Sequence, residues 1–121
     1  MIQQTNKIVI LTKPISVNRL YCGRRFLTKE GKAIKEAMAW EVKSQWKHKI
    51  LDKAIGIEIY FFVPNKKSDL DNLLKGLLDI LTGIIYKDDS QIYAIHCYKV
   101  IDKQRPRIEI EAKININQFS Y

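Results

Sequence analysis

Hydrophobic and polar residues along the chain follow two periods, one typical of strands and one typical of helices. Four segments are β-branched or alternate apolar with polar residues, and turn-forming residues flank them. They predict strands at residues 7–12, 54–63, 91–101 and 107–114. In the last segment isoleucines alternate strictly with charged residues, which is typical of a strand with one face in solvent.

Two other segments repeat apolar residues at helical spacing instead. Residues 29–50 follow Thr28, a good N-cap residue, and their polar face is rich in lysine. A second helix is predicted to start near Asn72 and to close at Gly83. Its apolar stripe consists of Leu73, Leu74, Leu77, Leu78 and Leu81.

The resulting order is strand, long helix, strand, helix, strand, strand. Because only the short segment 102–106 separates the last two strands, we expect them to form an antiparallel hairpin. The chain of 121 residues suits one core, and it contains no repeats or low-complexity segments. We therefore predict an α+β fold with one domain over residues 1–121, in which two helices lie mainly on one face of a mixed sheet of about four strands.

The chain is strongly basic, since 21 Lys and Arg residues against 13 Asp and Glu residues give a formal net charge of +8. This excess favours a polyanionic partner, most simply nucleic acid, with an anionic membrane surface as the weaker option and a plain solubility charge as the alternative. Arginines interleaved with aromatic residues in segment 15–27 suit phosphate contact and base stacking, or an ordinary surface loop. These arginines are Arg19, Arg24 and Arg25.

Other features of the composition exclude some classes of protein. No apolar run approaches the ~20 residues of a membrane span, so no membrane partner is expected. The two cysteines lack the spacing of a zinc site or a disulfide framework. Together these features predict a protein of the reducing cytoplasm.

Two aspartates stand two residues apart, at Asp69 and Asp71, between a predicted strand and a predicted helix. In extended backbone such residues point to the same side, so both carboxylates can converge at the helix N-terminus. Lys75 follows Asp71 by one helical turn. A second acidic pair, Asp88 and Asp89, precedes the next strand, and we expect the strand–helix–strand unit to bring it close to the first. Several carboxylates in one place form a site suited to Mg²⁺ or Mn²⁺.

In a basic protein the matching substrate for such a site is a phosphodiester, because the metal can activate water and neutralise the leaving oxygen. A nearby lysine can stabilise charge in the transition state. The competing interpretation is structural: Ser68 caps the helix, Asp71 is its capping-box partner and also pairs with Lys75. The chain would then be a DNA-binding protein without catalysis. An enzyme acting on small molecules would leave the net charge unexplained.

The segment SDLDNLLKGLLDILTGIIYKDDSQI closely resembles the core motif of the RusA family of Holliday junction resolvases. That motif runs Asp-x-Asp-Asn, Lys, Leu-x-Asp-x-Leu, and then Asp-Asp followed by a small residue and Gln. The upstream segment PISVNRLYCGRRFLTKEGKAIKEAM also resembles the family's N-terminal part, with Ser-x-Asn, a basic loop and a helix. The resemblance covers roughly residues 10–100, and the connection TGIIYKDD is one residue shorter than the family pattern.

The resemblance implies a RusA-like fold and an endodeoxyribonuclease that resolves four-way DNA junctions by paired symmetric nicks, in DNA recombination and repair. It implies a homodimer that uses Mg²⁺ or Mn²⁺ and is encoded by bacteria, phages or prophages. A two-fold dimer presents two equal sites to the paired strands of a junction.

The resemblance also assigns roles to residues. It implies that Asp69, Asp71 and Asp89 bind the metal and act in catalysis, that Lys75 is the essential lysine, and that Asp88 is the less critical acid of its pair. Asp89 is chosen over Asp88 because it stands directly before the Ser-Gln pair. Beside the three arginines, we expect DNA contacts from the lysines that flank the acidic pairs, which are Lys66, Lys67 and Lys87.

Overall fold

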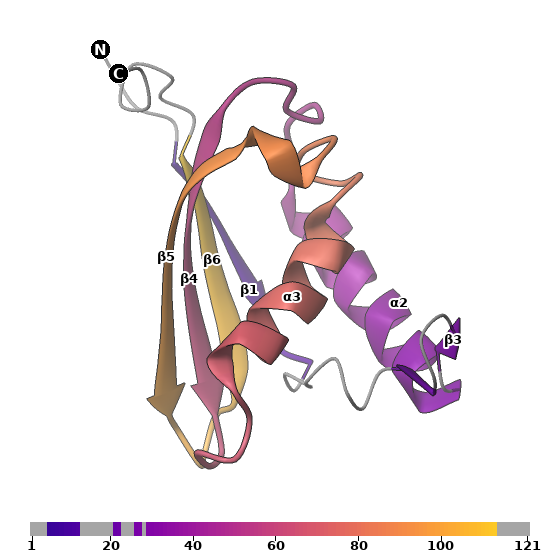
Figure 1. The fold of residues 1–121 in the computed structure, drawn as a ribbon, viewed down its shortest axis with the longest axis vertical. Coiled ribbons are helices and arrows are strands. Elements are labelled where there is room, and N and C mark those ends of the chain that lie inside the picture. The colour runs from indigo at the N-terminus through magenta and orange to yellow at the C-terminus, as the bar shows by residue number, and fades with distance from the viewer. Residues whose placement is uncertain (1–4, 13–20, 23–25, 28, 114–121) are drawn as a thin grey trace.

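The computed structural model describes residues 5–12, 21–22, 26–27 and 29–113, in which two helices cover one face of a four-stranded sheet (Figure 1). The strands are β1 (Thr5–Ile10), β4 (Ile55–Val63), β5 (Ile92–Ile101) and β6 (Arg107–Lys113). The helices are α2 (Lys29–Gln45) and α3 (Leu70–Leu81). A short 3₁₀ turn, η1 (Asp89–Gln91), precedes β5, and β2 (Tyr21–Cys22) pairs with β3 (Phe26–Leu27) apart from the main sheet. The predicted α+β fold with a mixed sheet is confirmed.

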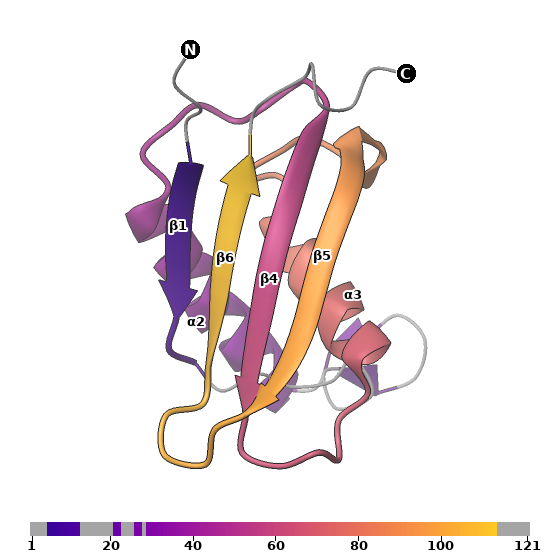
Figure 2. The ribbon, with the colours of Figure 1, turned by 90° about the vertical axis from the view of Figure 1, so that its left-hand side faces the viewer.

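The order of the strands in the sheet is β1-β6-β4-β5, and only β4 and β5 run parallel. The expected hairpin of the last two strands is therefore wrong, because β4 lies between β5 and β6 (Figure 2). Strand β4 has an inner position, because it pairs parallel with β5 on one side and antiparallel with β6 on the other. The crossover through α3 sets β5 parallel on one side of β4, and β6 takes the other.

The core lies between the sheet and the two helices. Alternate residues of β4 and β6 face it, as the strict alternation in the last strand predicts. The leucine stripe of α3 packs against them, with Leu73, Leu77 and Leu81 each almost fully buried. Gly76 is also buried, and an ion pair between Lys35 and Asp79 (2.6 Å) ties α3 to α2. No helix in the described part of the chain is long and apolar enough to cross a membrane.

The ends of the helices differ from the predicted ends for local reasons. Helix α2 stops at Gln45, where the buried Trp46 follows and residues 47–50 are exposed. Helix α3 begins two residues early, at Leu70. Its predicted stop is confirmed, because Gly83 follows the C-cap with a φ of 90°, which favours glycine.

Candidate active site

Two acidic residues lie at the N-terminus of α3, as predicted. Asp69 is the N-cap residue and Asp71 belongs to the first turn, and both side chains are exposed. An N-cap carboxylate commonly accepts a hydrogen bond from the free N–H groups of the first turn. The Asp69 side chain makes no such bond. Its carboxylate is therefore not used to cap the helix.

The structural interpretation of this motif is wrong in its details. The N-cap is Asp69 and not Ser68, so Asp71 is not at the capping-box position. Within the described residues, neither Asp71 nor Lys75 takes part in an ion pair. The carboxylate of Asp71 and the ammonium of Lys75, which the structural interpretation pairs with each other, are thus available to a ligand.

A lysine that the sequence analysis did not single out fixes the loop before α3. The ammonium of Lys99 on β5 donates to the carbonyl oxygens of Ser68 (2.8 Å) and Lys66 (3.2 Å). The Asn65 side chain accepts from the N–H of Lys67 (2.9 Å) and closes a turn in the same loop. Lys99 holds the segment that carries Asp69 against the end of the sheet. The only signal in the sequence was alternation, which puts Lys99 on the same face of the strand as the half-buried Cys97.

The two acids of the second pair have different surroundings. Asp88 caps η1, where its carboxylate accepts from the N–H of Ser90 (2.9 Å). Hydrogen bonding by Ser90, from its side chain and its backbone, lowers the pKa of Asp88 below its usual value. Gln91 completes the capping box, because its Oε1 accepts from the N–H of Asp88 (2.9 Å) while its amide nitrogen donates to the carbonyl of Leu51 (2.8 Å). Asp88 and Gln91 therefore have structural roles.

Asp89 is the acid of this pair that no cap uses. Its carboxylate accepts from the hydroxyl of Thr82 (2.8 Å), and Thr82 is the C-cap residue of α3. The Thr82 oxygen also lies 2.8 Å from the carbonyl of Leu78, so its one hydrogen is shared between two acceptors. Behind it, the hydroxyl of the buried Tyr86 donates to the same carbonyl (3.2 Å), and burial raises the pKa of Tyr86 to about 12. This setting favours Asp89 over Asp88 as a functional residue.

The two acidic pairs do not converge within one chain. Asp69 is the N-cap residue at the start of α3 and the carboxylate of Asp89 is bonded to Thr82 at its end, so the 12 residues of the helix separate them by about 18 Å. The cause is direction: β4 and β5 are parallel, so α3 runs back along the sheet and the chain enters β5 at the opposite end (Figure 2). The expectation of one cluster is wrong for a single chain. Within the described ranges, no three His, Cys, Asp or Glu side chains form a group that could hold a metal ion.

The lysines that are expected to bind DNA lie in the exposed segments beside the two acidic pairs. Lys66 and Lys67 are exposed in the loop before α3, and Lys87 is exposed beside Asp88. The predicted arginines Arg19, Arg24 and Arg25 lie outside the described residues, and their role stays a prediction.

The donor set at the start of α3 fits a divalent cation. Two exposed carboxylates stand near each other at a helix end, and neither is bonded to another described side chain. Mg²⁺ is commonly bound through one or two carboxylates and several waters, together with phosphate oxygens of a substrate. Asp69 and Asp71 suit this mode of binding, whereas Asp88 is engaged in a cap.

These features define a small basic α+β protein whose acidic residues lie at both ends of one crossover helix. Residues 12–113 match the family model described as Endodeoxyribonuclease RusA, so the chain belongs to the RusA family. It is 35% identical over 77 residues to the Crossover junction endodeoxyribonuclease RusA of Aquifex aeolicus, a match that covers 61% of this chain and 60% of that protein. It is also 43% identical over 47 residues to the Uncharacterized protein YqaN of Bacillus subtilis, covering 39% of this chain and 32% of that protein.

Proposed function

We propose that this protein is a structure-selective, metal-dependent endodeoxyribonuclease that cuts four-way DNA junctions by paired symmetric nicks. Membership of the RusA family and the similarity to a protein named as a crossover junction endodeoxyribonuclease support this function. The observation that carries it is the exposed Asp69 carboxylate, which stands beside Asp71 at a helix N-terminus and makes no capping bond, in a chain of net charge +8. We expect the enzyme in the cytoplasm of a bacterium, encoded by the host or a phage.

In this proposal Asp69 and Asp71 hold Mg²⁺ or Mn²⁺. The bound ion supplies Lewis-acid activation of water and neutralises charge on the phosphate. Lys75 is exposed one turn further along α3, where its ammonium can contact a phosphate oxygen and stabilise the charge that develops there. Lys66 and Lys67 provide phosphate contacts that position the strand beside the acids. Lys99 keeps the loop in place while the DNA binds.

A third acidic ligand is expected from a second copy of the chain. Asp89 of the same chain is at the far end of α3, so it cannot join Asp69 and Asp71. In a homodimer with two-fold symmetry, Asp89 of the partner subunit can complete the site, and the same operation completes a second site. Two equal sites match the two equivalent strands that must be cut in a four-way junction.

A junction-cleavage assay tests this function. Purified native protein is incubated with a labelled four-way junction and with linear duplex of the same sequence, each in EDTA and in Mg²⁺. We expect paired nicks in the junction only with the metal, and no cleavage by Asp69→Asn or Asp71→Asn, although both variants still bind the junction. Binding without cleavage by the native protein would instead indicate a non-catalytic DNA-binding protein.

A further inference from the structure

The connection between β5 and β6, residues 102–106, is a turn whose shape is fixed by a carboxylate. The side chain of Asp102 accepts from the N–H groups of Gln104 (3.1 Å) and Arg105 (3.0 Å), in the manner of an Asx turn. The N–H of Asp102 donates to the carbonyl of Val63 (2.7 Å), which is the last residue of β4. The 102–106 turn is thus attached to the end of β4 as well as to the two strands that it joins.

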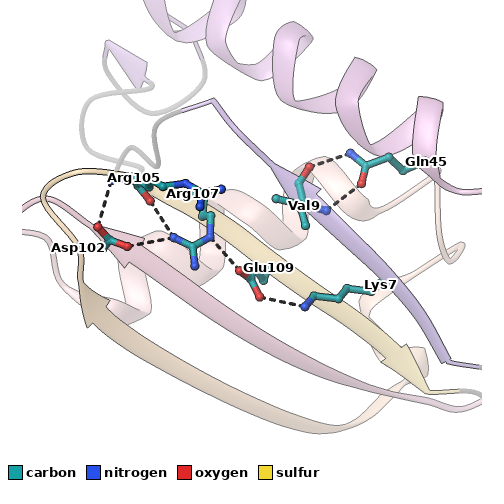
Figure 3. Close-up of polar contacts among 7 residues, drawn as sticks. All are labelled: Lys7, Val9, Gln45, Asp102, Arg105, Arg107 and Glu109. Atoms are coloured by element: carbon teal, nitrogen blue, oxygen red, sulfur yellow. Dashed lines mark hydrogen bonds and ion pairs between the residues drawn. The ribbon is translucent and has the colours of Figure 1, made fainter.

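Arg107 holds this turn from the other side. Its guanidinium donates to the carboxylates of Asp102 (3.1 Å) and Glu109 (2.8 Å) (Figure 3). It also donates to the carbonyl of Arg105 (2.9 Å) and lies over the ring of Phe62, 3.8 Å from the ring centroid. The hydrogen bonds from the N–H of Arg105 and from the Arg107 side chain lower the pKa of Asp102 below its usual value, so this carboxylate stays charged at neutral pH. The charge of Arg107 is therefore already compensated within the protein.

Arg105 has the opposite arrangement, with a fixed backbone and an open side chain. Its N–H is bonded to Asp102 and its carbonyl to Arg107, and Pro106 restricts the residue before it to extended conformations. The side chain is exposed, and its guanidinium forms no ion pair or hydrogen bond with another described residue. A guanidinium matches the oxygens of a phosphate with two parallel hydrogen bonds. A fixed backbone reduces the entropy lost when such a side chain binds.

The 102–106 turn lies at the end of the sheet that carries the first acidic pair. Residues 64–68 lead from the end of β4 to Asp69, and the bond between Asp102 and Val63 joins the turn to that same strand end. Figures 1 and 2 both show the two connections at one end of the sheet. The uncompensated charge of Arg105 is thus presented on the side of the molecule where a strand of DNA would meet the acids.

We propose that Arg105 binds a phosphate of the DNA strand that is cut at Asp69 and Asp71, beside the scissile phosphate, and that Asp102 and Arg107 are positioning residues that present it. This inference rests on the proposed function, in which the scissile phosphate is bound at the two acids. A strand held only at that phosphate can pivot about it. A second contact from a fixed turn sets the direction of the strand through the site, which hydrolysis requires for the correct line of attack.

The first test compares two substitutions that remove one positive charge each. Arg105→Gln acts at the turn, and the matched control, Lys43→Gln, acts at an exposed position in the last turn of α2. Binding to a four-way junction is measured in EDTA over a range of salt concentrations. Arg105→Gln should bind about tenfold more weakly, and its slope of log affinity against log salt should fall by about one. Lys43→Gln should change neither quantity, and equal losses in the two variants would show that only the net charge matters.

The second test separates the position of Arg105 from the charge of its surroundings. Asp102→Ala removes a negative charge, so electrostatics alone predicts tighter binding of the junction. The proposal predicts weaker binding, because the N–H of Arg105 loses its acceptor and the turn is no longer fixed. Adding Asp102→Ala to Arg105→Gln should then cost no further affinity, since both changes act through the same contact. Tighter binding by Asp102→Ala in a protein that melts normally would overturn the positioning role.

A chemical change in the DNA tests the contact itself. Junctions are prepared with one neutral methylphosphonate at each position around the nicked bond. The native protein should lose affinity when the phosphate beside the nick is neutral, and Arg105→Gln should lose nothing more at that position. Equal losses in both proteins at every position would overturn the contact. A native protein that shows this Arg105-dependent position but cuts no junction would refute the proposed function and leave the contact standing.

Discussion

The hydroxyl of Thr82 lies 2.8 Å from the carboxylate of Asp89, which it fixes at the C-terminal end of α3. Asp69 is the N-cap residue at the other end of the same helix, and its carboxylate makes no capping bond there. Each half of the candidate site is thus built on a rigid element, and neither half is complete in one chain. The proposed function therefore requires that the two ends of α3 meet in an assembly of two chains.

Thr82 is predicted to position Asp89. Thr82→Val removes the hydroxyl with little change in shape, and we expect cleavage to fall about tenfold, equivalent to about 1.4 kcal/mol for a hydrogen bond to a charged acceptor. Thr82→Ser keeps the hydroxyl and should restore most of the rate. Single-turnover cleavage rates of the three proteins, with melting temperatures as the folding control, make the comparison. Equal rates for the Val and Ser variants would show that this bond does not matter for catalysis.

The Asp69 carboxylate is predicted to bind the metal and not to stabilise the N-terminus of α3. Asp69→Asn should change the free energy of unfolding in EDTA by less than about 0.5 kcal/mol, because Asn is as good as Asp at an N-cap position. Mg²⁺ or Mn²⁺ should stabilise the native protein more than the variant, by mass action. Urea unfolding with EDTA and with each metal measures both effects. Equal stabilisation of the two proteins by metal would place the ion elsewhere.

Lys99 is predicted to be a positioning residue for the loop before α3. Lys99→Met keeps the length of the side chain but leaves the carbonyl oxygens of Ser68 and Lys66 without their donor. We expect weaker metal binding at Asp69 and slower cleavage, with a loss of stability on the order of 1–3 kcal/mol. The matched control is Lys103→Met, which removes the same charge from an exposed position just beyond β5. If both variants lose junction affinity equally and both bind metal as tightly as the native protein, Lys99 acts only through its charge.

The stability of the protein is predicted to depend on Tyr86 at high pH. Burial raises the pKa of Tyr86 from 10.0 to about 12 in the folded state, so its neutral form is favoured by folding. The corresponding stability is complete below pH 10 and is lost as the pH rises through 12. Tyr86→Phe cannot ionise, so the difference in unfolding free energy between native protein and variant should shrink over this range. A difference that is constant with pH would mean that Tyr86 titrates normally.

The sequence was sufficient to predict those elements whose periodicity reflects burial. The alternation around Ile108 and Ile110 and the leucine stripe of α3 both face the core in the structure, because the core imposes those patterns. Strand neighbours were harder to predict, since β6 pairs with β1 and β4 across long stretches of chain and not with β5, which is adjacent in sequence. Asp69 and Asp71 were placed correctly at a helix N-terminus.

The error about the acidic cluster has a physical cause. A parallel strand–helix–strand unit puts the segment before its helix and the segment after it at opposite ends of the sheet, so sequence proximity of Asp71 and Asp89 is misleading. Lys99 and Gln91 were missed as structural residues because each acts on backbone carbonyls 31 to 40 residues away. Such contacts leave no periodic trace in the sequence.

Complementation between two inactive subunits tests the central claim most directly. Asp71→Asn and Asp89→Asn chains with different affinity tags are co-expressed, and the heterodimer is isolated by both tags. We predict that each homodimer is inactive and that the heterodimer regains one complete site, formed by Asp69 and Asp71 of one chain and Asp89 of the other. It should nick one strand of a junction at about half the total native rate, since one of two equal sites is intact. A heterodimer that binds the junction but cuts no strand would contradict the shared site.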